Sequence, residues 1–314
     1  MRRFLIRRII FVILAFFGAT IFVFGLSRMA KDPRELFIPD TGYGINQEQW
    51  IELGNQLGFD KPVVVQYFLW VGRILRGDFG ESLGLQRPVL EVLGGKWGTT
   101  LQLALGGWLF AVLVGVPLGV LAAVKRGTLL DLLGRGFALF GQALPGFWTG
   151  IMFILLFAVI LHWLPAGTRG TWRGFPLAWE NVKYYILPSI VLGWPAAAGI
   201  MRLTRSSMLE VLDAEYIKFA RAKGVSTWKV IWKHALRNSL IVPLTSTLFL
   251  MAGYLNGALV VETVFSWPGI GWIALNRAVY NNDFPLLLGS VFFFIAIFLF
   301  FSFIADVLYA YIDP

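Results

Sequence analysis

The sequence predicts an all-α membrane protein whose chain crosses the bilayer six times. Of its 314 residues, 57% are hydrophobic and only 14% are charged, whereas soluble domains carry about 25% charged residues. The mean hydropathy of +0.70 agrees with this balance. The uncharged residues also form six long continuous stretches, each long enough for a transmembrane helix, which needs about 20 mostly apolar residues. Lipid is therefore the expected solvent for much of the chain.

The predicted spans are the stretches that contain no Asp, Glu, Lys or Arg. In chain order they cover residues 9–27, 97–124, 136–162, 184–201, 238–261 and 284–305. The third uncharged stretch runs on to Thr168, and we assign its end to an outer loop. Prolines inside the spans, among them Pro117 and Pro145, are compatible with spanning helices because neighbouring helices can satisfy the freed backbone groups. The first stretch has the basic start of a signal peptide, but its length and the lack of an A-x-A site before Arg28 favour a retained span.

The basic residues predict that both termini lie in the cytosol. With that orientation the N-terminal segment and the inner loops hold fifteen Lys and Arg residues, and the two short outer loops hold four. This excess follows the positive-inside rule. Segment 28–96 is too long to be counted under the rule and becomes a large extracytoplasmic loop. Residues 262–283 form another extracytoplasmic loop, and residues 202–237 form the main cytosolic loop.

Composition excludes several kinds of site. The chain has no cysteine, so it has no disulfide, thiolate metal site or cysteine nucleophile, and its two histidines are far apart. We expect no bound metal or cofactor, and we attribute the net charge of +9 to the inner loops rather than to nucleic-acid binding. None of the six spans contains a charged residue, whereas ion-coupled carriers usually place such residues in the membrane. Energy for any transport is therefore expected to come from another protein.

One face of the second predicted span is lined by small residues. Ala111, Gly115 and Gly119 recur at every fourth position, and small residues let helix backbones approach closely. The face fits either packing within this chain's own helix bundle or packing against a second membrane subunit.

The cytosolic loop predicts two helices joined at a glycine. Ser207 followed by Glu210 is typical of a capping box that starts a helix, and Gly224 is placed to end it. Ser226 or Thr227 can cap the second helix. Apolar residues recur at helical spacing in both helices: Met208, Leu212, Tyr216, Phe219 and Ala220 in the first, and Trp228, Ile231, Trp232 and Ala235 in the second. The segment fits either a basic helix resting on anionic headgroups or a knob that docks into a partner's groove.

The run EYIKFARAKGVSTWKVIWKHALRN at residues 215–238 resembles the EAA loop of membrane subunits in binding-protein-dependent ABC importers. We call these residues the elbow. The general pattern is Glu-Ala-Ala followed after three residues by glycine, and the elbow matches it at Ala220, Gly224 and, downstream, Leu236. Its departures are those of the dipeptide and oligopeptide permease branch: Lys218, Phe219, His234 and Arg237.

Three further segments resemble the same branch, in the same order along the chain. They are Leu57–Leu83, the ALPGFW stretch at Ala143–Trp148, and ETVFSWPGIG at Glu262–Gly271. The resemblance covers nearly the whole chain and points to the B-type subunit of peptide and nickel systems. It implies the six-helix type I ABC importer architecture, in a single transmembrane permease domain over residues 1–314.

The resemblance implies a non-catalytic permease subunit in the plasma (inner) membrane of a prokaryote. Its partners would be a second homologous permease subunit, two ATPase subunits or domains, and an extracytoplasmic solute-binding protein. ATP and Mg would bind to the ATPase partners, since this chain contains no G-x-x-x-x-G-K-[ST] motif. The solutes would be di- or oligopeptides, with nickel chelates, glutathione or oligosaccharides as alternatives. A self-sufficient channel or carrier and a membrane scaffold without transport are the competing classes.

The resemblance also assigns contact with the ATPase to part of the elbow, namely Glu215, Tyr216, Ala220, Ala222, Lys223, Gly224 and Leu236. Closure of the ATPase dimer would push on Ala220–Gly224 and rock the helix bundle. Gly224 would be important because the backbone turn expected there tolerates no Cβ atom.

Two outer segments are candidates for a gate or for contact with the binding protein. Their residues are Trp267, Pro268, Gly269, Gly271, Asp78 and Gly80. The first outer loop also predicts a helix that begins at Asp60-Lys61-Pro62 and ends at Gly77. One face of that helix would carry Val64, Tyr67, Phe68, Val71 and Leu75. A lid or turn with a purely structural role is the alternative for both segments.

Overall fold

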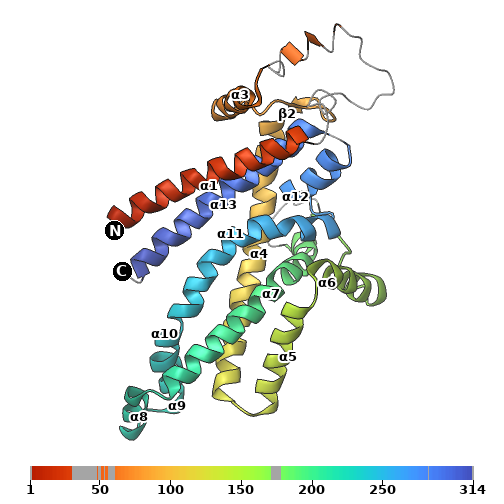
Figure 1. Ribbon diagram of the computed structural model, residues 1–314. Coiled ribbons are helices and arrows are strands. Elements are labelled where there is room, and N and C mark those ends of the chain that lie inside the picture. Colours follow the sequence, from red (N-terminus) through yellow and green to blue (C-terminus); the bar gives the residue numbers. More distant parts are fainter. Residues whose placement is uncertain are drawn as a thin grey trace. The chain divides into compact units, whose positions relative to one another are not determined.

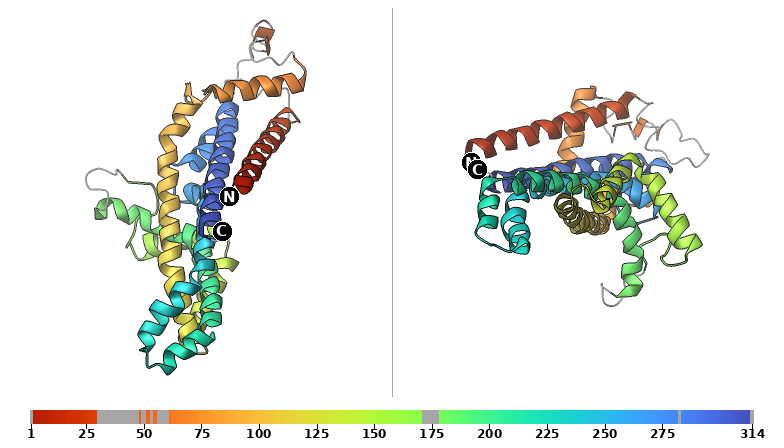
Figure 2. Two further views of the ribbon diagram at one scale, coloured as in Figure 1. Left: turned by 90° about the vertical axis from the view of Figure 1, so that its left-hand side faces the viewer. Right: turned by 90° about the horizontal axis from the view of Figure 1, so that it is seen from below.

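The computed structural model describes residues 2–29, 48, 51–52, 54–55, 61–170, 178–281 and 283–312. These residues are mainly helical (Figures 1 and 2). The chain divides into two compact units. The first unit comprises residues 1–100 and 268–303, and the second comprises residues 101–267 and 304–314. The start of the predicted outer loop, from residue 30 to Asp60, lies almost wholly outside the described residues.

The first unit combines long apolar helices with a short hairpin. Its elements are α1 (Arg2–Met29), α3 (Val63–Leu75), β1 (Glu81–Ser82), β2 (Arg87–Pro88), the start of α4 (Val89–Val124), α12 (Ile270–Ile273), the π-helix η4 (Ala274–Val279) and most of α13 (Phe284–Ile312). In the antiparallel hairpin Glu81 lies opposite Pro88 and Ser82 lies opposite Arg87. The core is formed by buried aliphatic side chains from α4, α12, η4 and α13, namely Val89, Val92, Leu93, Ile270, Ile273, Ala278 and Leu286.

A buried carboxylate holds the hairpin against the start of α13. Asp283 is 1% exposed, and it accepts hydrogen bonds from the Ser82 hydroxyl and, at 3.0 Å, from the Gly84 backbone N–H. The Leu286 backbone N–H also donates to Asp283 at 3.2 Å. Because Leu286 lies in the first turn of α13, Asp283 acts as its helix cap.

The second unit is built around α7 (Trp179–Leu212), which packs against α5 (Leu129–Ala143) on one side and α11 (Ile241–Val264) on the other (Figure 1). Its other elements are the rest of α4, α6 (Gly146–Phe153), the π-helix η2 (Ile154–Ile160), α8 (Glu215–Ala222), α9 (Thr227–Lys229), the π-helix η3 (Val230–Ala235), α10 (Leu236–Ser239) and the end of α13.

The small residues of the second predicted span pack inside this unit. A Cβ atom added at Gly115 would lie 2.7 Å from the Ala197 carbonyl oxygen, and one added at Gly119 would lie 2.7 Å from the Met201 carbonyl oxygen. Both carbonyls belong to α7, so the small face lets α4 and α7 approach each other closely. Of the two expected roles, packing within the chain's own bundle is therefore the one the structure supports.

A buried ion pair joins α5 to α7. The Asp131 side chain is 2% exposed and accepts hydrogen bonds from Arg205 Nε at 2.8 Å and Arg205 Nη2 at 3.0 Å. The Gly127 backbone N–H donates to the same carboxylate at 3.1 Å, and Arg135 Nε lies 3.6 Å away. The bidentate geometry fixes the start of α5 on α7.

Among the described residues, four helices are long and apolar enough to cross a membrane. They cover Ile6–Leu26, Val89–Val124, Trp179–Leu212 and Phe284–Val307. The predicted span 238–261 corresponds to α11, several of whose side chains lie outside the described residues. The helices extend past the predicted spans because the sequence criterion stopped at the first charge.

The predicted span 136–162 is not one continuous helix. Its residues belong to α5 and to the following helix over Gly146–Ile160, and the two are bent by 111° at the break. Leu144 before Pro145 takes an extended conformation, with ψ 131°, because a proline disfavours helical backbone in the residue that precedes it. Our expectation that Pro145 is compatible with an unbroken span is therefore wrong.

The helix that holds the fifth predicted span continues past it. Glu262, the first residue of the predicted outer loop 262–283, lies inside α11 and is fully buried. The helix continues to Val264 and ends where Ser266 takes a positive φ of 50°. A carboxylate that is buried within protein does not have to mark the end of a membrane helix.

Candidate functional site

The elbow follows directly from α7. This helix continues to Leu212, so Ser207 lies in its interior and the predicted capping box does not start a helix. Thr204, three residues before Ser207, and Met208, directly after it, are both fully buried. This packing keeps the chain helical past Ser207. The backbone turns at Ala214, with ψ 146°, and α8 begins at Glu215.

The end of α8 confirms the predicted glycine stop. Gly224 has φ +76°, a left-handed conformation that glycine adopts without a steric penalty. The Val225 backbone N–H donates to the Ala220 carbonyl at 3.2 Å, and the Gly224 N–H donates to the Arg221 carbonyl at 2.9 Å. This pair of bonds forms a Schellman motif, which satisfies the last carbonyls of the helix.

The second helical segment of the elbow starts at the predicted place but is not a regular α-helix. It begins at Thr227 with Ser226 as its cap residue, although no side chain forms a capping hydrogen bond. Residues Val230–Ala235 form a π-helix, whose wider turns place Val230 and Ala235 on the buried side. Trp228 is 69% exposed and Trp232 is 39% exposed, so the predicted stripe that joined them to Ala235 is wrong.

A compact apolar cluster anchors the elbow to the ends of the long helices. Its buried members come from α4, α7, α8 and η3, and they are Val120, Ala123, Met208, Ile217, Val230 and Ala235. Ile217 is fully buried, although it was not among the residues of the predicted stripe. The predicted stripe ran through the break at Ala214 and therefore included Tyr216 and Phe219, which are 44% and 66% exposed.

A hydrogen bond closes the elbow at its base. Asn238 Nδ2 donates to the Tyr216 hydroxyl oxygen at 2.8 Å and to the His234 carbonyl at 3.2 Å. Because Tyr216 lies on α8 and Asn238 on α10, this contact joins the first helix of the elbow to the last one.

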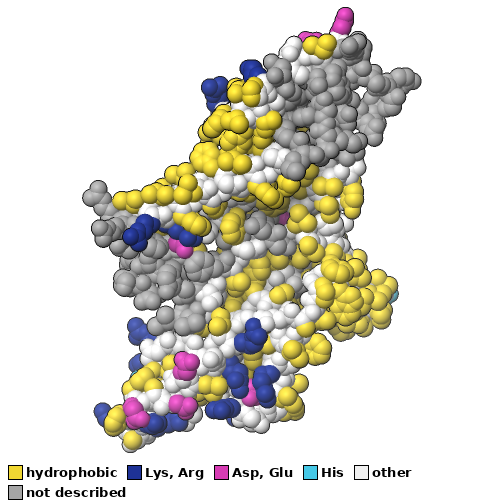
Figure 3. All heavy atoms as spheres, viewed as in Figure 1, with side chains coloured by type: hydrophobic (Ala, Val, Ile, Leu, Met, Phe, Trp, Pro, Cys, Tyr) yellow, Lys and Arg dark blue, Asp and Glu magenta, His cyan; other side chains and the backbone are white. Residues whose placement is uncertain are grey.

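The predicted coupling residues fall into two groups. Ala220 and Leu236 are partly buried against the anchoring cluster. The other five are exposed, and they are Glu215, Tyr216, Ala222, Lys223 and Gly224. Lys218 Nζ lies 2.7 Å from Glu215 Oε1. Lys, Arg, Asp and Glu side chains gather over this lower part of the unit, whereas the side chains over α6 are almost all hydrophobic (Figure 3). The elbow therefore presents charged groups and exposed aromatic rings on a rigid base.

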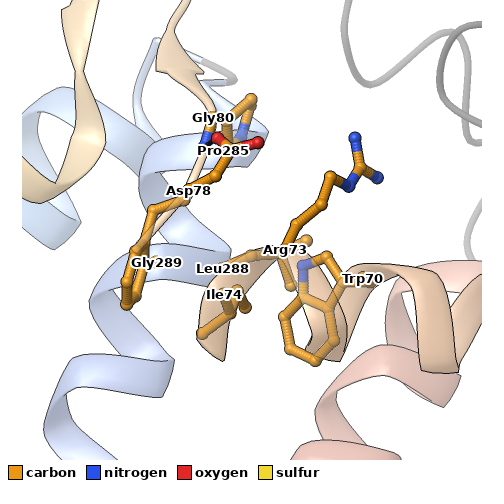
Figure 4. A pocket seen from close by; sticks show the side chains of 9 residues that line it. Trp70, Arg73, Ile74, Asp78, Gly80, Pro285, Leu288 and Gly289 are labelled. Atoms are coloured by element: carbon orange, nitrogen blue, oxygen red, sulfur yellow. Dashed lines mark hydrogen bonds between the residues drawn. The ribbon is translucent and has the colours of Figure 1, made fainter. Parts of the chain in front are cut away.

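The outer candidates Asp78 and Gly80 form a turn in the first unit. Asp78 Oδ1 accepts a hydrogen bond from the Gly80 N–H at 3.0 Å, and Gly80 has φ +78°. Both residues line a small cavity of about 70 Å³ together with Trp70, Arg73 and the start of α13 (Figure 4). Phe79 between them packs against the core cluster that includes Ile270.

The other outer candidates divide between the two units, and all are buried except Pro268, which is partly buried. In the first unit Gly269 precedes α12, Gly271 is buried in it, and Ile270 N–H donates to the Thr100 hydroxyl at 2.9 Å. In the second unit Trp267 is fully buried, and its ring centroid lies 5.8 Å from that of Tyr185.

A polar group near Trp267 was missed by the sequence analysis. Arg169 Nε donates to Gln102 Oε1 at 3.0 Å, and the Tyr185 hydroxyl donates to the Gln102 carbonyl. Burial lowers the pKa of Arg169 from its ordinary value. These residues come from three separate segments, so no local sequence pattern could have grouped them.

Comparison with known proteins identifies the family. Residues 115–314 match the model for "Binding-protein-dependent transport system inner membrane component", and residues 1–104 match the model for its N-terminal region. The chain is 37% identical over 338 residues to the dipeptide transport system permease protein DppB of Escherichia coli strain K12, covering all of this chain and 98% of that protein. It is 34% identical to the oligopeptide permease AppB of Bacillus subtilis, covering all of this chain and 99% of that protein.

A third relative and a solved structure extend the comparison. The glutathione transport system permease protein GsiC of Salmonella paratyphi A is 39% identical over 260 residues, covering 82% of this chain and 81% of GsiC. An inward-facing structure of the MetNI methionine ABC transporter matches the fold with a TM-score of 0.57 and 16% identity, covering 72% of this chain and 98% of that chain. By these full-length matches the chain belongs to the inner-membrane components of binding-protein-dependent transport systems.

Proposed function

We propose that this protein is the permease subunit of an ATP-driven importer for di- and oligopeptides. It forms half of a translocation pathway with a second homologous permease subunit and crosses the membrane six times, with both termini in the cytosol. The full-length similarity to dipeptide and oligopeptide permeases supports the solute class. The chain itself is not catalytic, and ATP and Mg bind to two ATPase partners.

The observation that carries this proposal is the anchored elbow. Ile217 and Val230 are fully buried in a cluster that includes Met208 at the end of α7 and Val120 near the end of α4. A force on α8 is therefore passed to two long helices rather than absorbed by a loose loop. We assign the surface that contacts the ATPase to the exposed Tyr216, Phe219 and adjacent coupling residues of this chain.

The exposed aromatic rings favour docking of the elbow on a partner protein over contact of the elbow with a lipid surface. Phe219 is 66% exposed on α8, and Trp228 and Trp232 are exposed on the second segment with ring centroids 5.1 Å apart. Large aromatic side chains next to basic groups are typical of the centres of protein interfaces. Contact of this surface with anionic headgroups is the competing interpretation.

At the outer side, Asp78, Gly80, Trp267, Pro268, Gly269 and Gly271 are assigned to a gate or to contact with the solute-binding protein. Glutathione is the second candidate solute, since GsiC is 39% identical over most of this chain. Uptake of a labelled dipeptide and of labelled glutathione, measured in cells with and without this chain, separates the two.

The first test is the composition of the native complex. The tagged chain is solubilised gently from its host, and the proteins that copurify with it are identified. A second permease subunit together with ATPase chains is the expected result. A homogeneous preparation without ATPase, under conditions that preserve a known ABC importer, would contradict the coupling role of the elbow.

A further inference from the structure

We propose that α3 lies in the outer leaflet at the membrane boundary, with one face on α1 and α13 and the opposite face in contact with lipid acyl chains. The helix was expected to be a lid packed on the bundle, a contact for the binding protein or a gate. Its assignment to the outer leaflet rests on the topology in the proposed function, and its contact with lipid rests on the observations below.

The depth of α3 follows from its contacts with α1. The Tyr67 hydroxyl is hydrogen-bonded to Thr20 Oγ1 at 2.9 Å, and the rings of Tyr67 and Trp70 each lie 5.5 Å from the ring of Phe24. Helix α1 ends at Met29. At a rise of about 1.5 Å per residue, Phe24 and Thr20 lie about 8 and 14 Å before that end. Both residues are within the apolar stretch 9–27, so α3 contacts α1 inside the predicted span rather than above it.

Contacts with α13 also place α3 below the outer ends of the long helices. The ring of Trp70 lies 6.2 Å from that of Phe292, and Phe292 in turn lies 5.1 Å from Phe16 of α1. Helix α13 begins at Phe284, so Phe292 lies about 12 Å along it. Helices that rest in a membrane interface bury their apolar face about 5–10 Å into the boundary between headgroups and acyl chains.

The face of α3 that points away from the protein is apolar. Tyr67, Val71 and Ile74 are buried, whereas Val64, Phe68 and Leu75 are 67%, 64% and 70% exposed. The expected single face of Val64, Tyr67, Phe68, Val71 and Leu75 is therefore divided between a buried side and an exposed side. An exposed apolar face of this kind next to two membrane helices requires a covering, and water would be an unfavourable one.

The exposed end of α3 is continuous with the apolar surface of the spanning helices. Leu75 lines a groove of about 490 Å³ with Ile13, Phe16 and Phe17 of α1 and Phe300 of α13, and all of its lining side chains are apolar. Acyl chains fit such a groove, because flexible hydrocarbon matches its chemistry. The exposed Arg76 directly after α3 can extend its guanidinium toward the headgroups. A soluble binding protein could not cover a surface that continues between spanning helices.

The absence of cysteine in the chain allows a direct test. Val64→Cys and Phe68→Cys are compared with Glu81→Cys, which alters an exposed residue of the nearby hairpin. Each variant is labelled with a bimane fluorophore, and the full complex is reconstituted with phospholipids brominated in their acyl chains. Strong loss of fluorescence at positions 64 and 68, with little loss at 81, is the expected result. Equal loss at all three positions would overturn the proposal, as would protection of positions 64 and 68 from a charged maleimide only after the binding protein is added.

A second labelling site separates this proposal from the proposed function. Arg126→Cys, at an exposed residue of the predicted inner loop between α4 and α5, should react with a membrane-impermeant maleimide in inside-out vesicles and not in intact cells. If it reacts from the same side as Glu81→Cys, the assignment of α3 to the outer leaflet is wrong. Loss of the ATPase from an otherwise intact membrane protein, with quenching as expected, would contradict the proposed function and support the position of α3.

Discussion

Asn238 donates a hydrogen bond to the Tyr216 hydroxyl at 2.8 Å and so joins the two ends of the elbow. The residues between them include the left-handed turn at Gly224 and the π-helical turns at Val230–Ala235. Ile217 is buried beneath the elbow in the cluster that anchors it to α4 and α7. Together with this cluster, the hydrogen bond makes the elbow a rigid unit. A rigid unit can transmit a displacement to α4 and α7, and coupling to an ATPase requires this property.

Removing the closing hydrogen bond should loosen the elbow without unfolding the protein. Tyr216→Phe and Asn238→Ala each remove one partner of an exposed bond, for which a net loss of about 1 kcal/mol is expected. Amide hydrogen exchange in residues 215–239 should then be faster by about fivefold. Amide exchange in the double variant should be no faster than in the faster of the two single variants, because both changes remove the same contact. Unchanged exchange in both single variants would show that the bond does not hold the elbow.

Substitution of Gly224 should weaken coupling through backbone strain alone. A Cβ atom at Gly224 meets nothing within 4 Å, so Gly224→Ala causes no clash, but its φ of +76° costs a residue with a Cβ about 1–2 kcal/mol. Solute-stimulated ATP hydrolysis of the reconstituted complex should fall in Gly224→Ala and fall less in Gly224→Asn, since asparagine adopts this conformation more readily.

Gly136→Ala is the matched control for Gly224. Its added Cβ also meets nothing within 4 Å, but the residue lies in regular helix α5. Replacing glycine by alanine there should be neutral or stabilising. Equal rates of ATP hydrolysis in Gly224→Ala, Gly136→Ala and the unchanged chain would show that the turn at Gly224 has no role in coupling.

Truncation of Ile217 should destabilise the base of the elbow. Ile217 is fully buried, and deletion of a buried isoleucine side chain to alanine costs about 2–5 kcal/mol. Ile217→Ala should therefore lower both the thermal stability of the purified chain and the amount of ATPase that copurifies. Phe219→Ala should leave the stability unchanged and lower only the copurified ATPase, because this ring is 66% exposed. The reverse pattern would place the docking surface elsewhere.

Breaking the buried ion pair between α5 and α7 should cost more than replacing it. Asp131→Asn leaves the Arg205 guanidinium without its carboxylate partner. Loss of one partner of a fully buried pair costs about 3–5 kcal/mol, and because the Arg205 side chain is 23% exposed the loss here should be smaller. The double variant Asp131→Asn/Arg205→Met should recover part of this loss in a thermal unfolding assay. A double variant less stable than Asp131→Asn alone would show that Arg205 stabilises the unit through other contacts.

Features set by local chemistry could be predicted from the sequence. The absence of charge located the four long apolar helices found among the described residues, Gly224 located the end of α8, and Pro62 with Gly77 bracketed α3. These predictions succeed because each depends on residues that act within one or two turns of the chain.

Features that depend on tertiary packing could not be predicted in this way. Pro117 lies between Gly115 and Gly119, where α4 is held against α7, and the helix continues through it. Pro145 ends α5, although its sequence context is equally apolar. The stripe in the second part of the elbow failed because it assumed 3.6 residues per turn, whereas Val230–Ala235 form a π-helix.

Long-range polar contacts could not be predicted from the sequence either. Asp283 and Ser82 are 201 residues apart, and Arg169 and Gln102 are 67 residues apart. No periodicity links such positions. The anchor residue Ile217 was within reach, since a helix that begins at Glu215 places Ile217 and Ala220 on one face, but the break before it was not recognised.

The most direct test of the account is a crosslink from the exposed face of α8. A photoreactive phenylalanine analogue is placed at Phe219 in the native complex, with the same analogue at Phe140, which is 58% exposed on α5, as the control. We expect the analogue at position 219 to crosslink to the ATPase subunit, with a crosslink yield that changes when ATP is bound. The analogue at position 140 should give no ATPase adduct. Adducts of position 219 with lipid alone, in a complex that retains its ATPase, would contradict the account.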